Sequence, residues 1–332
     1  MITQGGPGSQ KVLGIDVGGT LTRGALVDRT GEVWARVEHP TDRTAGTKGI
    51  VGVVEELLGL RDDPSPQAIG IGGAGFIDAA TGSVTFSPNL VYDDPHVADA
   101  VQLRAGGLPV IVDNDANVAA LGERAFGSAQ GLDFVAYVTL GTGIGSGFID
   151  RGRLIRGFSG AGAELGHMVI DPEGPECPCG LRGCLEQMAS GTAIARMARE
   201  AVETDPQSSI LAFAGEIESI TAKDVARAAR ELDETARDVL RRAGRSLGIG
   251  LSNVVNLFDP EVIVLGGSVV QAGEPFLGPA RDRLFEMTSA QRRRPMRIDV
   301  TSLKGDAGLL GAAALAFQAL DEGRTTPPSG RS

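Results

Sequence analysis

Residues Val12–Asp28 read Val-Leu-Gly-Ile-Asp-Val-Gly-Gly-Thr-Leu-Thr-Arg-Gly-Ala-Leu-Val-Asp: an apolar run, a glycine-rich turn and a second apolar run. Short apolar runs bounded by turn residues are typical of buried strands. Because Gly18 and Gly19 carry no side chains, backbone amides at the turn can approach an anion closely. The stretch predicts a hairpin with an anion-binding tip. A plain hairpin turn explains the same glycines, and this stretch alone does not separate the two.

The same pattern of apolar run, turn and apolar run recurs at the start of the second half of the chain. Phe134–Leu140 is an apolar run, Gly141-Thr142-Gly143 is a turn, and a second run continues through Ile149. One such turn is weak evidence of function. Two copies, each opening one half of the chain, indicate an internal duplication with two phosphate-binding hairpins that face each other across a cleft.

Between the two copies, strand and helix patterns alternate. Residues 46–59 place apolar side chains on one face and end in a glycine, which predicts a helix. Gly70, Gly72 and Gly75 match the dinucleotide-binding pattern G-x-G-x-x-G. We reject that interpretation because residues 76–86 predict a turn-linked pair of strands, where the dinucleotide motif requires a helix.

Polar residues follow a predicted strand at 109–112. Asp113-Asn114-Asp115-Ala116-Asn117 joins this strand to a helix that continues to about Phe126. Acids and amides at a helix start are usually caps, and this explains Asn114. Ligands in α/β proteins also bind at the carboxyl ends of strands, so this group predicts a binding site as well.

All three cysteines of the chain, Cys177, Cys179 and Cys184, lie close together and shortly after His167. Three thiolates and an imidazole form a complete ligand set for a closed tetrahedral zinc site. The alternative is a disulfide with one free thiol. The odd number of cysteines and the lack of a secretory signal weigh against the disulfide.

Composition excludes several classes of function. The chain has 332 residues, enough for two domains with their own cores, and a formal net charge of −11 that disfavours nucleic acid and anionic membranes. The opening MITQGGPGSQ lacks the features of a signal peptide, and no apolar run is long enough to cross a bilayer. We expect a cytoplasmic protein.

Five motifs occur in order along the chain: DVGGT, DNDAN, LGTGIG, ELGH and CPCGLRGCLE. Together they resemble the ROK family of sugar kinases and repressors, especially its bacterial ATP-dependent glucokinases, over roughly residues 11–320. One position departs from the family pattern. The usual small-Gly-Glu run before the histidine reads Gly162-Ala163-Glu164 here.

The resemblance implies the actin-like, ribonuclease-H-like ATPase fold, with two α/β domains and a cleft between them. We expect a small domain at 11–117 plus 306–320 and a large domain at 118–305 that carries the zinc-binding loop. Residues 1–10 and 321–332 are expected to be disordered tails. The family also suggests a homodimer or a homotetramer.

The implied reaction is phosphoryl transfer from ATP, with Mg²⁺, to a sugar hydroxyl. Asp115 corresponds to the general base that takes the proton from the 6-hydroxyl of glucose. The sugar-binding positions correspond to Asn89, Asn114, Asp115, Glu164, His167 and Glu186. The phosphate, magnesium and adenine positions correspond to Asp16, Gly18, Gly19, Thr20, Gly141, Thr142, Gly143 and Gly267. Structural zinc corresponds to His167, Cys177, Cys179 and Cys184, with the second ring nitrogen of His167 on the sugar.

Other activities within the family remain open. The chain could phosphorylate N-acetylmannosamine, N-acetylglucosamine or fructose. Sugar-sensing repressors of the family carry a helix-turn-helix domain before the first strand, whereas few residues precede Lys11 here and the acidic composition disfavours DNA. Polyphosphate-using relatives lack the cysteine cluster, which favours ATP as the donor.

Overall fold

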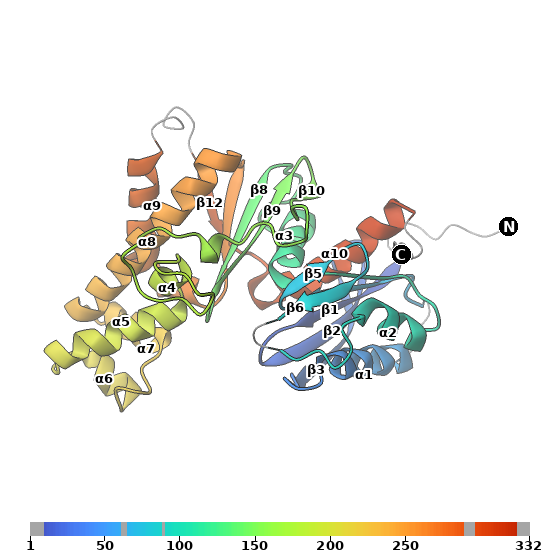
Figure 1. The fold of residues 1–332 in the computed structure, drawn as a ribbon, viewed down its shortest axis with the longest axis horizontal. Coiled ribbons are helices and arrows are strands. Elements are labelled where there is room, and N and C mark those ends of the chain that lie inside the picture. The colour runs from blue at the N-terminus through green and yellow to red at the C-terminus, as the bar shows by residue number, and fades with distance from the viewer. Residues whose placement is uncertain (1–9, 61–64, 88–89, 289–295, 324–332) are drawn as a thin grey trace. The chain divides into compact units, whose positions relative to one another are not determined.

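The computed structural model describes residues 10–60, 65–87, 90–288 and 296–323 (Figure 1). Contacts along the chain divide it into two compact units. The first contains residues 1–137, 147–163 and 301–332, and the second contains residues 138–146 and 164–300.

The first unit contains a five-stranded sheet in the order β3-β2-β1-β4-β7. Its strands are β1 (Lys11–Val17), β2 (Leu21–Asp28), β3 (Val33–Pro40), β4 (Ile69–Gly73) and β7 (Val110–Asn114). Strands β1, β2 and β3 are antiparallel neighbours, whereas β1, β4 and β7 are parallel. In register, Val17 lies opposite Gly73, and Gly73 lies opposite Asn114. The carboxyl ends of β1 and β7 therefore meet at one edge of the sheet.

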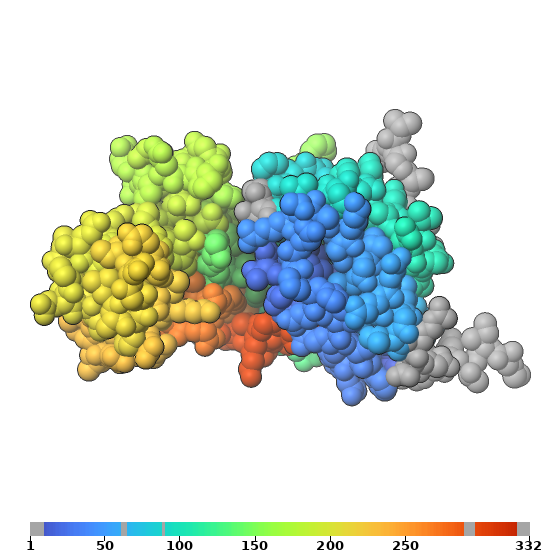
Figure 2. Space-filling view, turned by 90° about the horizontal axis from the view of Figure 1, so that it is seen from below, coloured from blue at the N-terminus to red at the C-terminus, as the bar shows by residue number. Residues whose placement is uncertain are grey.

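Helices cover both faces of this sheet (Figure 1). Helix α1 (Gly46–Gly59) has the predicted bounds and buries Ile50, Val53, Val54 and Leu57 in a core shared with β1 and β4. Its outer face is seen in blue in the space-filling view (Figure 2). Helix α2 (Val97–Arg104), which the sequence did not predict, packs into the same core.

Helix α10 (Ala307–Asp321) packs on the opposite face of the sheet, where glycines allow close contact. A Cβ atom added at Gly14 would lie 2.5 Å from the carbonyl oxygen of Leu309, and one at Gly70 would lie 1.8 Å from that of Ala312. Strands β5 (Phe76–Asp78) and β6 (Ser83–Phe86) form the predicted hairpin. Rejection of the dinucleotide motif is confirmed, because Gly70 serves helix packing.

The boundary between the units differs from the one expected at residue 117. Helix α3 (Asp115–Phe126) packs so closely on α10 that a Cβ atom at Gly311 would lie 1.7 Å from the carbonyl oxygen of Val118. This contact explains why residues 118–137 belong to the first unit.

Residues 10 and 321, which were expected in the disordered tails, make side-chain contacts in the first unit. Asp321 is the last residue of α10 and forms an ion pair with Arg29, whose Nε also donates to the side chain of Gln10. Residues 10 and 321 are therefore ordered parts of the first unit. Residues 322 and 323 are also described, whereas residues 1–9 and 324–332 of the predicted tails lie outside the described residues.

A second five-stranded sheet has the order β10-β9-β8-β11-β12, which repeats the order of the first sheet. Its strands are β8 (Val135–Leu140), β9 (Ile144–Asp150), β10 (Arg153–Leu154), β11 (Val262–Gly266) and β12 (Arg297–Val300). The boundary between the units runs through β8 and β9. The shared strand order agrees with the predicted internal duplication.

Helices make up most of the second unit. They are α4 (Glu186–Ala189), α5 (Gly191–Thr204), α6 (Ser209–Ala214), α7 (Ala222–Arg230), α8 (Glu234–Phe258) and α9 (Glu274–Met287). The sequence pattern predicts helices at 191–203, 222–231 and 235–257, and α5, α7 and α8 confirm them, with ends that differ by single residues. Short 3₁₀ turns are η1 (Leu165–His167), η2 (Val269–Ala272) and, in the first unit, η4 (Lys304–Asp306). Among the described residues, no helix is long and apolar enough to cross a membrane.

Gly311→Ala tests the contact between α3 and α10. The added methyl group overlaps the backbone of Val118, so we expect a loss of about 3 kcal/mol or more in the free energy of unfolding. Gly52→Ala, in α1, is the matched control because no atom lies within 4 Å of the new Cβ. Alanine stabilises a helix interior by about 1 kcal/mol relative to glycine. Urea denaturation followed by the fluorescence of Trp34, the only tryptophan, reports the first unit. Equal midpoints for the two variants would contradict this packing.

Candidate active site

Asn114 connects β7 to α3 at the carboxyl edge of the first sheet. Its Oδ1 accepts hydrogen bonds from the backbone N–H groups of Ala116 (2.9 Å) and Asn117 (3.2 Å), so it caps the helix. Its Nδ2 donates to the carbonyl oxygen of Gly75 at 3.1 Å. The capping role considered for Asn114 is confirmed, and both ends of its amide are held in place.

Asp115 is the first residue of α3 and is half-buried. Its Oδ1 accepts a hydrogen bond from the backbone N–H of Ala116 at 2.8 Å, and the positive end of the helix dipole stabilises its negative charge. Tyr92 lies nearby: burial raises the pKa of its phenol, and the charge of Asp115 raises it further. The phenol donates to the carbonyl oxygen of Ala74 at 3.1 Å. Tyr92 therefore keeps its proton at neutral pH.

Asp113 fixes the end of β7 through hydrogen bonds to its neighbours. Its Oδ1 accepts from the backbone N–H of Asn114 at 2.8 Å and from Nδ2 of Asn117 at 2.9 Å. Its Oδ2 accepts from Nε of Arg156 at 2.6 Å. The sequence analysis did not single out Arg156, because no local pattern links a residue beyond β10 to the end of β7. The buried carboxylate of Asp113 connects three segments of the first unit.

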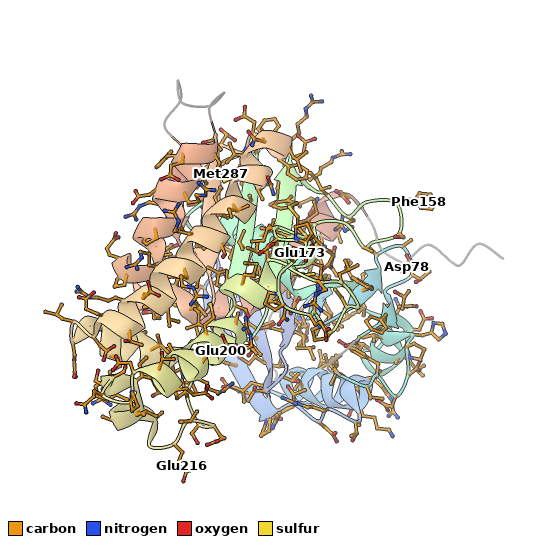
Figure 3. All side chains as sticks on the ribbon, turned by 60° about the vertical axis from the view of Figure 1, so that its left-hand side comes forward. Asp78, Phe158, Glu173, Glu200, Glu216 and Met287 are labelled. Carbon is orange, nitrogen blue, oxygen red and sulfur yellow. The ribbon has the colours of Figure 1, made fainter. Side chains whose placement is uncertain are left out.

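Arg156 begins a tight glycine-rich loop that ends at Ala163. The backbone N–H of Gly162 donates to the carbonyl oxygen of Arg156 at 2.9 Å and closes the loop. A Cβ atom at Gly160 would lie 2.4 Å from the carbonyl oxygen of Ile77, so the loop rests against β5. Phe158 projects from the loop into solvent (Figure 3).

Ala163 marks the departure from the family pattern. It has a φ of 67°, in the left-handed region where a residue other than glycine is strained by about 1–2 kcal/mol. Since Glu164 follows directly, the strained peptide adjoins a predicted sugar contact.

Asp16 is the next-to-last residue of β1 and is 6 % exposed. Burial raises the pKa of its carboxyl group; Arg23, its ion-pair partner, opposes this rise, and Asp306 adds to it. A Cβ atom at Gly308 would lie 2.8 Å from Oδ1, so the carboxylate also faces the first turn of α10. The sequence analysis missed Arg23, although the hairpin register places it directly opposite Asp16.

The turn after β1 exposes backbone donors. The N–H of Gly18 donates to Leu21, and the carbonyl of Gly18 accepts from the hydroxyl of Thr41 at 2.7 Å. Within the described part of the chain, the N–H groups of Gly19 and Thr20 have no protein acceptor. Both residues are exposed, so two amides are available to an anion, as predicted for this turn.

In the second unit, four donor atoms converge within 4.8 Å of one another: those of His167, Cys177, Cys179 and Cys184. Nδ1 of His167 lies 3.7 Å from Sγ of Cys177, and the sulfur atoms of Cys179 and Cys184 lie 3.6 Å apart. A tetrahedral zinc ion with bonds of about 2.3 Å to sulfur and about 2.0 Å to nitrogen requires separations of about 3.6–3.8 Å. The residues fit zinc. All three thiols are free, so the alternative of a disulfide is not adopted.

Backbone geometry explains why the sequence folds around these donors. The N–H of Cys177 donates to Leu181 at 2.8 Å, and that of Gly180 donates to Cys177 at 2.9 Å. Gly183 has a φ of 68°, and a Cβ atom there would lie 1.5 Å from the carbonyl oxygen of Asp171. Only glycine fits this position, so the spacing Cys-Gly-Leu-Arg-Gly-Cys is required by the turn.

The thiols differ in acidity. A hydrogen bond from the backbone N–H of Leu181 lowers the pKa of Cys179 to about 7. Burial raises the pKa of Cys184 to about 12 and also raises that of Cys177. Cys179 therefore ionises first.

Glu164 and Glu186 lie beside His167. Burial raises the pKa of Glu164, the charge of His167 lowers it, and that of Glu186 raises it. Oε2 of Glu186 accepts a hydrogen bond from the backbone N–H of Ile144 at 2.8 Å. Glu186 therefore connects the zinc-binding loop to the turn after β8, a contact that the sequence analysis did not foresee.

The turn at Gly141–Gly143 resembles the turn after β1. In the described part of the chain, the N–H groups of Thr142 and Gly143 have no protein acceptor. The carbonyl oxygen of Gly141 accepts from the N–H of Gly191 at 2.8 Å, which fixes the start of α5 beside the turn. Gly267 has a φ of 84°, and a Cβ atom there would lie 2.3 Å from the carbonyl oxygen of Leu140. The turn and Gly267 are neighbours.

The predicted residues thus form two groups. The first unit brings together Asp16, Gly18, Gly19, Thr20, Asn114 and Asp115 at one sheet edge. The second unit brings together Gly141, Thr142, Gly143, Glu164, His167, Cys177, Cys179, Cys184, Glu186 and Gly267. Asn89 lies outside the described residues.

Comparison with known proteins identifies the family. Residues 12–319 match the model of the ROK family. The glucokinase of Thermotoga maritima is 37% identical over 309 residues, which are 92% of this chain and 96% of that protein. The crystal structure of a ROK family glucokinase from Streptomyces griseus, in complex with glucose and AMPPNP, is 38% identical with a TM-score of 0.81, and the match covers 93% of this chain and 99% of that one.

A regulatory protein shares the fold as well. The structure of a ROK family transcriptional regulator, a homologue of the E. coli MLC protein, has a TM-score of 0.85 at 28% identity, and the match covers 95% of this chain and 79% of that one. The predicted actin-like ATPase fold is confirmed by these similarities. By its motifs, its fold and a match over nearly its whole length, the chain belongs to the ROK family.

Proposed function

We propose that the chain is an ATP-dependent glucokinase that transfers a phosphoryl group to the 6-hydroxyl of glucose. One observation carries the proposal: Asp115 and the turn of Gly18–Thr20 follow strand ends that are in register at one edge of the first sheet. A base and a set of anion-binding amides at one edge are what phosphoryl transfer to a hydroxyl requires. The similarity to glucokinases, one with glucose and AMPPNP bound, supports glucose and ATP as substrates.

Asp115 is the proposed general base and accepts the proton of the 6-hydroxyl. Asn114 holds a neighbouring hydroxyl through its amide group, which its contacts with α3 and Gly75 already orient. Asp113 and Arg156 keep this strand end in position. Asn89 is a further proposed sugar contact.

Glu164, His167 and Glu186 are the proposed partners of the other sugar hydroxyls. Because Nδ1 of His167 faces the cysteines, Nε2 is left for the sugar. When bound, zinc would supply rigidity, since four protein ligands leave no open position for substrate or water. His167, Cys177, Cys179 and Cys184 would hold it.

For the nucleotide, the proposed phosphate contacts are the amides of Gly18, Gly19, Thr20, Gly141, Thr142 and Gly143. Gly267 would contact the adenine, and Asp16 would hold Mg²⁺ through water. Mg²⁺, when bound with ATP, supplies charge neutralisation. We also propose a cytoplasmic location, a homodimer or homotetramer, and no membrane or nucleic-acid partner.

The regulator with the same fold makes sugar sensing the second candidate function. A coupled assay of ADP release over glucose, fructose, N-acetylglucosamine and N-acetylmannosamine separates the candidates, with polyphosphate as a parallel donor. We expect the highest kcat/KM for glucose with ATP. A higher value for an N-acetyl sugar would reassign the substrate, and sugar binding without turnover of any sugar would favour a sensor.

Asp115→Asn tests the general base. The change keeps the shape of the side chain but removes its ability to accept a proton, so kcat should fall by about 10²–10⁴ with little change in sugar affinity. Asp99→Asn is the matched control, because Asp99 is an exposed acid in the first turn of α2. Steady-state kinetics and calorimetric titration with glucose measure the two effects. Unchanged turnover by Asp115→Asn would reduce Asp115 to a structural helix residue.

Cys179→Ser tests whether zinc organises the sugar site. Serine is a poor zinc ligand, and structural zinc in peptides contributes on the order of 10 kcal/mol to local folding. We expect loss of zinc and a steep loss of glucose affinity, while ATP affinity is retained. Elemental analysis and separate calorimetric titrations measure these quantities.

Glu176→Gln is the control in the same loop, because Glu176 is exposed and pairs only with Arg182 among the described residues. It should keep both zinc and glucose affinity. A Cys179→Ser protein that has lost zinc yet binds glucose like the parent would show that the metal does not organise the site.

A further inference from the structure

A cavity of about 590 Å³ lies in the first unit, away from the sheet edge that carries Asp115. Its lining comes from the first residue of β1, from β3, and from the C-terminal ends of α1 and α2 (Figure 1). These segments meet at the amino-terminal end of β1, whereas Asp16 lies near its carboxyl end. The volume is typical of small-molecule sites. Within the first unit, the cavity is therefore separate from Asp16, the turn of Gly18–Thr20, Asn114 and Asp115.

Lys11 and Trp34 line one side of this cavity together. Lys11 is 2 % exposed, and its Nζ lies 3.5 Å from the centre of the Trp34 ring. Among the described residues, no carboxylate lies within ion-pair distance of Nζ. A buried ammonium group is costly without an anionic partner, and an aromatic ring compensates only part of that cost. The cavity therefore contains a cation that an anionic ligand would stabilise.

Asp28 does not neutralise Lys11, although the two are cross-strand neighbours. Its Oδ1 accepts from Thr30 and Glu32, and its Oδ2 accepts from the indole N–H of Trp34 at 3.0 Å. Asp28 is not part of the cavity lining. Its effect is to fix the orientation of the Trp34 ring, which is 55% exposed and presents a flat surface.

The other charged groups of the lining are Arg104 and Glu55, 3.6 Å apart. Among the described lining residues, Lys11 and Arg104 against Glu55 give a formal charge of +1, in a chain whose net charge is −11. The carbonyl groups at the C-terminal ends of α1 and α2 carry partial negative charge and reduce the positive potential of the lining. Arg104, in the last turn of α2, offsets them in part. Leucines supply the apolar remainder: Leu26, Leu57, Leu58, Leu60 and Leu108.

We propose that this cavity binds a small molecule with a flat apolar ring and one anionic group. The ring lies against Trp34 and the leucines, and the anionic group faces Lys11 and Arg104. This site is independent of glucose and ATP. The matched pair 8-anilinonaphthalene-1-sulfonate and N-phenyl-1-naphthylamine probes it, because the two share one ring system and only the first carries an anionic group.

Trp34 is the only tryptophan, so its fluorescence reports this cavity alone. We expect the sulfonate probe to bind with one-to-one stoichiometry, to quench Trp34 by energy transfer, and to bind more tightly than the neutral probe. Saturating glucose with a non-hydrolysable ATP analogue should not displace it. Displacement by the nucleotide, or binding that leaves Trp34 unquenched, places the probe elsewhere and overturns the proposal.

Two variants test whether the positive charges of Lys11 and Arg104 contribute to binding of the sulfonate probe. Lys11→Met keeps the apolar stem of the side chain, and Arg104→Gln changes a residue that is 63% exposed and is not expected to disturb folding. Each should weaken the sulfonate probe about tenfold, equivalent to one charge-assisted hydrogen bond, and leave the neutral probe unchanged. Lys48→Met, on the outer face of α1, is the control and should bind like the parent. Equal weakening of both probes, or no weakening in Arg104→Gln, contradicts an anion site.

Discussion

In the second unit, the donor atoms of His167, Cys177, Cys179 and Cys184 lie within 4.8 Å of one another, and we propose that a metal held there organises the sugar site. The segment around them has little regular structure, and glycine turns rather than a packed core determine its course. Without a metal, its three thiols and one imidazole restrain the conformation of this segment only weakly. With zinc, the same donors fix His167, and Glu164 and Glu186 lie beside that ring.

Glu186 connects this loop to the turn that we propose as a phosphate contact. Its carboxylate accepts from the backbone of Ile144, directly after the turn of Gly141–Gly143. The first unit positions its proposed site residues in a different way. There, parallel strands in register bring Asp16, the turn of Gly18–Thr20 and Asp115 to one edge, and Asp113 with Arg156 secures it. A metal-centred loop and a sheet edge thus hold the two groups of residues.

Much of this could be predicted from the sequence, because the information was local. The strand-turn-strand repeats, the helix at 46–59 and the cysteine cluster each follow from short-range patterns. Helix α2 was missed, because its few apolar residues form too weak a stripe among charged ones. The contact of Arg156 with Asp113 joins segments far apart in the sequence and leaves no local signal.

The observed boundary between the units also depends on contacts between segments far apart in the sequence. Residues 118–137 belong to the first unit because glycine contacts join α3 to α10 near the end of the chain, which no pattern around residue 117 reveals. The predicted site residues came from the resemblance to the ROK family. Their neighbours, such as Arg23 beside Asp16, required the structure.

Zinc K-edge X-ray absorption spectroscopy, with and without glucose, measures the ligands of the metal. We predict three sulfur ligands at about 2.3 Å and one nitrogen ligand at about 2.0 Å, with no change in the coordination shell when glucose binds. An oxygen ligand that glucose displaces, or a shell without three sulfurs, would contradict a closed site that serves only to hold His167 and its neighbouring carboxylates.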